Sequence, residues 1–358
     1  MTQADNRIIG IDVLKIAAML LIVLQHMLFQ GQILQAYETG TFAYALTQAL
    51  YQLTFFAVNC YALATGFLCY KSKIRYSRIA GIWLQTFFYS VLIYICFIVF
   101  GLHDFEIKDF IQYLLPILTS RYWYITAYFL LFLFMPILNV AIDKISKRAY
   151  KTLLLGLFVF MICGSVLYLV IFFHDPFRLK SGYSCLWLFV LYLFGAYIGK
   201  YEVGKTVNGK KLVLWFFVLL FGAIGLKTAL DNLGLDQYSF LFVAYISPVN
   251  FVLAIMFFVI CLKVDFANAK ARKITVLLSS ATLGVFLIHA HPLIREILTP
   301  KLVFLTEYSL AITVLCVLGL TVLVFVLCAV IDLLRAKLFK ASKLDVLVKK
   351  IDKKINFN

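Results

Sequence analysis

Long apolar runs alternate with short polar separators along almost the whole chain. Most of these runs hold about 20 residues, which is the length that an α-helix needs to cross the hydrocarbon core of a bilayer. The separators between them carry most of the charged side chains. The pattern predicts ten membrane-spanning helices, near residues 8–30, 45–69, 79–102, 121–142, 152–173, 183–200, 211–230, 240–262, 274–294 and 308–332.

Two segments depart from this pattern. Residues 105–120 are too few and too charged at their start to span, so we expect an interfacial helix on the outer side. Residues 333–358 alternate Leu, Val and Ile with Lys, which predicts a basic amphipathic helix along the inner leaflet, attracted to anionic lipids. We therefore divide the chain into a membrane-embedded domain, residues 1–332, and a cytoplasmic tail, residues 333–358.

Composition strengthens the expectation of an all-α polytopic membrane protein. Of the 358 residues, 64% are apolar and only 14% are charged, whereas soluble domains are usually about 45–50% apolar. The mean hydropathy is +0.97. These values exclude a soluble globular chain and a disordered one, because disorder requires low hydrophobicity. Ten spans leave short loops and no room for a soluble domain of useful size.

The distribution of Lys and Arg predicts the orientation. With the N-terminus in the cytoplasm, 25 of the 33 basic residues fall on the cytoplasmic side. This is a clear positive-inside bias, and it predicts that both termini are cytoplasmic. It also explains the net charge of +16 without nucleic acid as a partner. Six basic residues fall outside, namely Lys108, Arg121, Arg178, Lys180, Arg295 and Lys301.

The eight cysteines lie in or beside the apolar runs, and none has the spacing of a metal site. We interpret them as small buried hydrophobic residues. No metal and no bound cofactor are expected.

The first predicted span contains three ionisable residues, Asp12, Lys15 and His26. An ionisable group in the hydrocarbon region costs roughly 2.5–3.5 kcal/mol on insertion scales, so each is a candidate functional residue. Asp12 and Lys15 are one helical turn apart, and a self-neutralising pair with Lys15 extended toward the cytoplasmic surface is an alternative interpretation.

His26 lies about two-thirds of the way along this span, toward the outer leaflet, and no acidic residue beside it on the helix explains its presence. Imidazole is the side chain best suited to take a proton from a hydroxyl at neutral pH. His26 is therefore a candidate general base, and hydrogen-bonded packing is the alternative.

The ninth predicted span carries His289 and His291 near its outer end, after Ser279, Ser280 and Thr282. Residues two apart on a helix point about 200° away from each other, so only one of these histidines can face the same cavity as His26. We favour His289 because it lies deeper.

The loop after the second predicted span contains a basic cluster, and two of its arginines are one helical turn apart. Guanidinium groups at that spacing can hold a phosphate through forked hydrogen bonds. Ordinary positive-inside anchoring is the alternative explanation. The cluster consists of Lys71, Lys73, Arg75 and Arg78.

Four stretches occur in an order and spacing that resemble a known family. They are Ile11–Lys15 followed after ten residues by His26, then Ala57–Phe67, Tyr122–Ile125 and Leu283–His289. Together they resemble the motifs of the membrane-integral acyltransferase family often called acyltransferase-3, and the resemblance covers essentially the whole chain. The sequence Ala57–Tyr61 resembles that of the family branch whose genes lie beside surface-polysaccharide genes in Gram-positive bacteria.

The resemblance implies transfer of an acetyl group from acetyl-CoA to a hydroxyl of a capsular or other cell-surface polysaccharide, or of its lipid-linked precursor, at the bacterial plasma membrane. His26 would match the essential histidine of the family, and Lys15 would match its arginine. Asp12 belongs to the same motif. Arg75 and Arg78, with Lys71 and Lys73 beside them, would bind the donor.

Two residues depart from the family pattern. Lys15 replaces an arginine, so bidentate recognition is lost and a point charge remains. Asn59 stands where many members have Asp, so it can offer no carboxylate. Asn59, Trp123, Tyr124 and His289 are candidates for the cavity or for acceptor binding, and an aromatic belt at the outer interface is the alternative for the two aromatic residues.

The residues permit two routes. His26 can act as general base on a sugar hydroxyl, or it can carry the acyl group transiently. Lys15 and His26 are eleven residues apart, about 16 Å along a helix, which suits the pantetheine arm of CoA. The alternative function is a transporter or flippase for a glycan intermediate, with the buried polar groups lining its path. The scarcity of carboxylates within the spans disfavours a proton-driven carrier.

Overall fold

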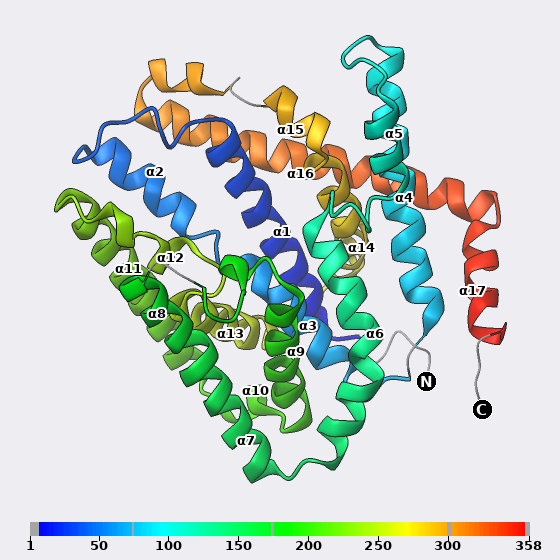
Figure 1. Cartoon of the computed structure of the whole chain (residues 1–358), viewed down its shortest axis with the longest axis horizontal. Coiled ribbons are helices and arrows are strands. Elements are labelled where there is room, and N and C mark those ends of the chain that lie inside the picture. Colours follow the sequence, from blue (N-terminus) through cyan, green and yellow to red (C-terminus); the bar gives the residue numbers. More distant parts are fainter. Residues whose placement is uncertain (1–6, 74, 173–174, 299–301, 355–358) are drawn as a thin grey trace.

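The computed structural model of the protein describes residues 7–73, 75–172, 175–298 and 302–354. Over these residues it consists of helices and contains no strand, as expected for an all-α polytopic membrane protein (Figure 1). Lys301 and the ends of the two predicted domains, residues 1–6 and 355–358, lie outside the described residues.

Each of the ten predicted spans corresponds to helical structure. Nine helical segments of the described chain are long and apolar enough to cross a membrane, and the tenth, α9, is a shorter apolar helix of 16 residues. The corresponding elements are α1 (Ile9–Gln30), α2 (Phe42–Gln52) with α3 (Ala57–Cys69), α4 (Tyr76–Val99), α6 (Trp123–Lys144), α7 (Lys147–Gly156) with η1 (Leu157–Cys163) and α8 (Gly164–Phe172), α9 (Cys185–Lys200), α11 (Gly209–Asn232), α12 (Phe240–Val243) with α13 (Pro248–Leu262), α14 (Ala269–His289) and α16 (Leu310–Ala341).

Three of these segments are interrupted. The second bends between α2 and α3, where the Thr54 hydroxyl donates to the Tyr51 carbonyl and so satisfies a group released at the helix end. The fifth contains the π-helix η1, bounded by Gly156 and Gly164. In the eighth, α13 starts at Pro248, a residue that suits the first turn of a helix.

The remaining helices are short. The segment expected at the interface contains α5 (Ile107–Leu114), which packs against α4, and the others are α10 (Val203–Thr206), α15 (Pro292–Leu298), α17 (Leu344–Lys354) and the 3₁₀ turns η2 (Lys180–Gly182), η3 (Asp236–Tyr238) and η4 (Val303–Glu307). The predicted domain boundary after residue 332 falls inside α16, which continues to Ala341.

Helices α3 and α9 make the most extensive contact between two helices of the described chain. A Cβ on Gly66 would lie 2.0 Å from the Tyr192 carbonyl oxygen, and one on Gly195 would lie 2.0 Å from the Leu63 carbonyl oxygen. The two glycines therefore allow the backbones to touch, as small residues do between membrane helices.

Helix α1 lies inside the bundle, in contact with α3, α13, α14 and α16 (Figure 1). These contacts bury Asp12 and most of the apolar side chains of α1. The ionisable residues of α1 are therefore held by protein on several sides, which is the arrangement that polar groups in a membrane require.

Candidate active site

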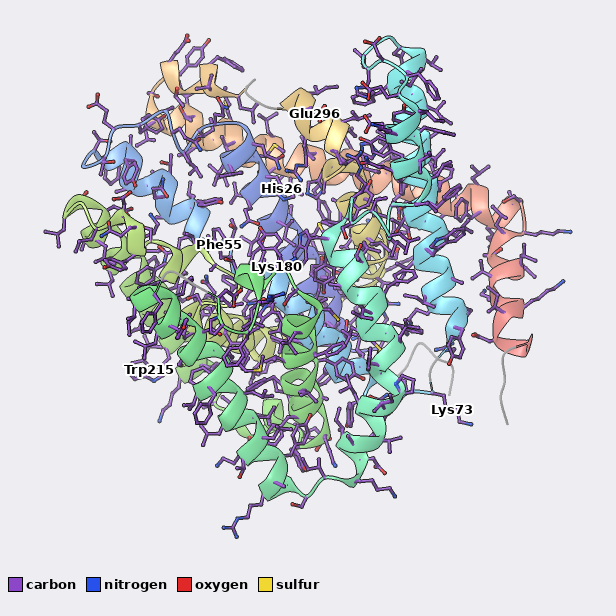
Figure 2. The ribbon with its side chains drawn as sticks, viewed as in Figure 1. His26, Phe55, Lys73, Lys180, Trp215 and Glu296 are labelled. Atoms are coloured by element: carbon purple, nitrogen blue, oxygen red, sulfur yellow. The ribbon has the colours of Figure 1, made fainter. Side chains whose placement is uncertain are left out.

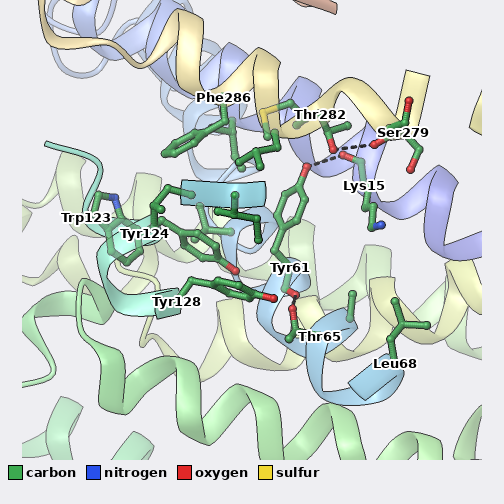
Figure 3. A pocket seen from close by; sticks show the side chains of 18 of the residues that line it. Lys15, Tyr61, Thr65, Leu68, Trp123, Tyr124, Tyr128, Ser279, Thr282 and Phe286 are labelled. Carbon is green, nitrogen blue, oxygen red and sulfur yellow. Dashed lines mark hydrogen bonds between the residues drawn. The ribbon is translucent and has the colours of Figure 1, made fainter. Parts of the chain in front are cut away.

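A cavity of about 390 Å³ lies between α1, α3, α4, α6 and α14 (Figure 3). Five of the candidate catalytic and binding residues line it, which are Lys15, His26, Arg78, Trp123 and Tyr124, together with Ser279, Ser280 and Thr282 of α14. In Figure 3 Lys15 and Trp123 lie at opposite sides of the cavity, so the cationic and the aromatic residues line different parts of one space.

His26 is partly exposed, while its Nδ1 atom is buried and has no hydrogen-bond partner in the described part of the chain. The ring lines the cavity, so the other nitrogen, Nε2, is the one left to face that space. An unpaired imidazole nitrogen beside a cavity is available either to accept a proton or to bind a substrate group.

His289 is the partner that tertiary structure brings to His26. The two ring centroids are 5.0 Å apart and the rings are tilted by 44°. His289 Nδ1 lies 2.6 Å from the Val285 carbonyl oxygen, so Nδ1 carries the hydrogen and the buried Nε2 atom has no partner among the described residues. His291 points elsewhere and stacks on Tyr113 at 5.1 Å.

Asp12 does not line the cavity but contacts a residue that does. Its carboxylate accepts two hydrogen bonds of 2.7 Å from the Arg7 guanidinium and one of 2.6 Å from the Ser279 hydroxyl. The hydrogen bonds of Asp12 therefore go to Arg7 and Ser279 rather than to Lys15. Arg7 thus forms the ion pair with Asp12 that the sequence suggested for Lys15 as an alternative interpretation.

Lys15 lines the cavity, and its ammonium group makes no hydrogen bond with any described residue. Its backbone carbonyl accepts a 2.7 Å hydrogen bond from the Tyr61 hydroxyl, which connects α1 to α3 (Figure 3). The Lys15 charge is therefore available to a negatively charged ligand.

The basic cluster divides into two parts. All four residues are exposed, but only Arg78 lines the cavity, and it donates to the Cys69 thiol sulfur at 3.2 Å. Arg75 is the N-cap residue of α4. Figure 2 shows Lys73 at the end of the molecule where α4 begins and His26 in the interior.

Asn59 is fully buried but does not line the cavity. Its Nδ2 group donates to the Tyr245 carbonyl and its Oδ1 atom accepts from Trp187 Nε1, each at 2.9 Å. Both ends of the amide are thus used to connect α3, α9 and the turn before α13.

An aromatic cluster closes the side of the cavity near Trp123. The Trp123 ring lies 4.6 Å from Tyr183 and stacks at 6.1 Å, with an interplanar angle of 17°, on Tyr245. The Tyr245 hydroxyl donates to Gln25 Oε1 at 3.1 Å, next to His26 in the chain. Rings with hydroxyl groups at their edges form a surface that is apolar on its face and polar at its rim.

Four hydroxyl-bearing residues of the cavity were not anticipated from the sequence. Tyr61 and Thr65 lie within the stretch that resembles a family motif, so that motif was their available signal. Tyr128 and Tyr245 had none, because tyrosines are frequent in this chain and Tyr245 lies in a turn between two helices.

Among known proteins and families, one family model matches the chain. A family model described as an acyltransferase domain matches residues 8–332, which include every residue that lines the cavity. No curated protein and no solved structure matches the chain.

Proposed function

The chain belongs to this acyltransferase family and is a membrane acyltransferase, and we propose that it moves an acetyl group from cytoplasmic acetyl-CoA to a hydroxyl of a cell-surface polysaccharide or its lipid-linked precursor. The bacterial plasma membrane is the proposed location. The observation that carries the proposal is the single cavity that holds Lys15 and Arg78 together with His26 and the aromatic cluster.

The donor enters from the cationic side. Arg78 and Lys15 line the cavity, and the exposed side chains of Lys71, Lys73 and Arg75, just before Arg78 in the chain, attract the phosphates of CoA. The positive-inside bias puts this side of the protein in the cytoplasm, where acetyl-CoA is available. The thioester end then extends along α1 toward His26.

The acceptor meets the donor at His26. In direct transfer, His26 removes the proton of a sugar hydroxyl, and the hydroxyl oxygen attacks the thioester carbonyl. The C–S bond breaks, and the CoA thiolate leaves with the proton returned by the imidazolium. In the alternative route, the His26 nitrogen attacks the thioester carbonyl, the C–S bond breaks and CoA leaves as its thiolate. The sugar hydroxyl oxygen then attacks the acetyl carbon, the N–C bond to His26 breaks, and the hydroxyl proton passes through the imidazole to the CoA thiolate.

His289 positions His26 in either route. The ring centroids are 5.0 Å apart and no hydrogen bond joins the two rings in the structure, so a rotation of one ring is needed to bring their nitrogens within hydrogen-bond distance. The unpaired Nε2 atom of His289 would accept from Nδ1–H of His26, leaving the His26 nitrogen that faces the cavity free to take a proton. Catalytic hydrogen bonds are often loose before substrate binds.

Asp12 and the aromatic residues have supporting roles in this proposal. Asp12, held by Arg7 and Ser279, fixes the first turn of α1 against α14 and so orients Lys15. Trp123 and Tyr124 offer ring faces to a sugar, and Tyr245 extends that surface toward Gln25.

The test is acetyl transfer by the His26→Gln variant. Purified protein is incubated with radiolabelled acetyl-CoA and isolated polysaccharide, and label in the polysaccharide is counted. Loss of a general base reduces the rate by roughly 10²–10⁴-fold, so we expect almost no label. His103→Gln is the matched control, because His103 lies in a loop and pairs with Asp109.

Two results would count against the proposal. Retained transfer in His26→Gln, with the size-exclusion profile of the wild type, would reject the role of His26. Movement of glycan across vesicles without label transfer would support a carrier instead. The acceptor is tested in cells by comparing the acetyl content of surface glycans, measured by NMR, with and without the gene.

A further inference from the structure

Helix α17 lies alongside α4, and its C-terminal end reaches the start of α4 (Figure 1). The Asp352 carboxylate accepts a hydrogen bond of 2.7 Å from the Ser77 backbone N–H and a second from the Ser77 hydroxyl. Val348 packs over Gly81, one turn further along α4. The last described turn of the chain is therefore attached to a point 275 residues earlier.

This contact satisfies an end of α4 that has no local cap. Arg75 occupies the N-cap position, and no side chain within the helix caps it. The first N–H groups of a helix are unpaired and lie at its positive end, so they bind anions such as carboxylates and phosphates. Asp352 is an anion supplied by the chain itself.

The Asp352 carboxyl is ionised under ordinary conditions. The two hydrogen bonds from Ser77, with the nearby Arg75 charge, hold the pKa of Asp352 below its usual value. A carboxyl with a lowered pKa keeps its bound form above the usual value of about 3.9 and loses it only as the pH falls below that range. At neutral pH Asp352 therefore carries the negative charge that Ser77 binds in the structure.

Asp352 lies beside residues that we propose to bind the donor, since its partner Ser77 stands between Arg75 and Arg78 in the chain. Arg75 lies one residue before α4 and Arg78 lies within its first turn, lining the cavity. We propose that α17 is an autoinhibitory element whose Asp352 carboxylate competes with a phosphate of the CoA donor for the N–H and hydroxyl groups of Ser77. The inference rests on the proposed donor, and it adds a regulation that the family match does not include.

The consequence is that donor affinity depends on the state of α17. With α17 docked, a donor phosphate must displace Asp352 before it can use Ser77. With α17 released, the same groups are free and the donor binds more tightly. The intramolecular carboxylate is present at a high effective concentration, so a single substitution there changes the apparent affinity.

The test measures binding of CoA to purified full-length protein by titration calorimetry. Asp352→Asn removes the competing charge, and we expect CoA to bind roughly three- to tenfold more tightly than to the wild type. Asp345→Asn is the matched control, because it removes the same charge from the same helix without touching Ser77. A chain ending at Lys343, which lacks α17, should bind CoA as tightly as Asp352→Asn does.

Three other outcomes would contradict either the competition by Asp352 or the proposed CoA donor. Equal affinity in the wild type, Asp352→Asn and the shortened chain would reject competition and leave the donor proposal intact. Weaker binding in Asp352→Asn or in the shortened chain would also reject competition, because it would show that α17 helps to bind the donor. Absence of CoA binding in every variant would reject the donor itself, and the inference with it.

Discussion

His26 and Asn59 are both polar residues within apolar helices, and the tertiary structure gives them opposite surroundings. His26 lines a cavity and keeps an unpaired nitrogen, whereas both ends of the Asn59 amide are hydrogen-bonded away from the cavity. A buried polar group that is fully paired contributes to structure, and one that is left unpaired beside a cavity indicates a site. Residue type alone does not separate the two.

Removal of the Asn59 amide should destabilise the protein. In Asn59→Ala the Trp187 N–H and the Tyr245 carbonyl lose their partners in a buried position, at about 1–3 kcal/mol for each unpaired group. We expect the free energy of unfolding, measured by denaturant titration in detergent, to fall by about 2 kcal/mol or more. The control is Thr228→Ala, which removes a hydroxyl bonded only within its own helix. An Asn59→Ala protein as stable as this control would contradict the argument.

At the scale of elements, glycine positions determine where two helices can make close contact. Gly66 and Gly195 let α3 and α9 meet backbone to backbone, and Gly284 leaves room for the Asp332 carboxylate, which would lie 2.2 Å from a Cβ there. Helix α3 carries Tyr61 and Thr65 into the cavity, so this close contact also determines one wall of the site.

A methyl group at the α3–α9 contact should separate the helices. In Gly195→Ala the new Cβ would lie 2.0 Å from the Leu63 carbonyl oxygen, so the backbones must shift. Overpacking of this kind costs about 1–3 kcal/mol, and we expect a loss of that size in the free energy of unfolding. Gly222→Ala is the control, since nothing lies within 4 Å of its Cβ and alanine favours a helix. Equal stability of the two variants would show that the contact is unimportant.

At the scale of the whole molecule, the residues that line the cavity extend from Arg78, near the start of α4, to Trp123 and Tyr245. The exposed basic cluster lies where α4 begins, and Figure 2 shows Lys73 there and Glu296 at the opposite end. The proposed reaction needs these ends on opposite sides of the membrane, because donor and acceptor come from different compartments. The distribution of Lys and Arg predicts that the α4 start is cytoplasmic.

Labelling of single introduced cysteines tests this orientation. In intact cells a membrane-impermeant maleimide should label Glu296→Cys and should label Lys73→Cys only after the membrane is permeabilised. Both positions are exposed, whereas the eight natural cysteines are buried or half-buried, so the wild type gives the background. The reverse pattern would place the basic cluster outside and exclude entry of a cytoplasmic donor there.

The sequence also missed features at each scale. It did not reveal that Arg7 pairs with Asp12, that the second span breaks between α2 and α3, or that Asp352 reaches Ser77. Each depends on a partner or a bend that hydropathy does not encode. Tyr245 shows the same difficulty, because it enters the cavity from a turn between α12 and α13.

What the sequence determined by itself was the class of protein, the position of its ten helical segments and the small set of ionisable residues within them. These follow from local properties, since hydrocarbon requires each spanning segment to satisfy its own backbone hydrogen bonds and to exclude charge. Only the tertiary structure decided which of these residues share a cavity, and it placed His289, which the sequence favoured over His291, against His26. Such contacts join residues far apart in the chain, as His26 and His289 are, and they depend on how each helix is rotated and packed against its neighbours.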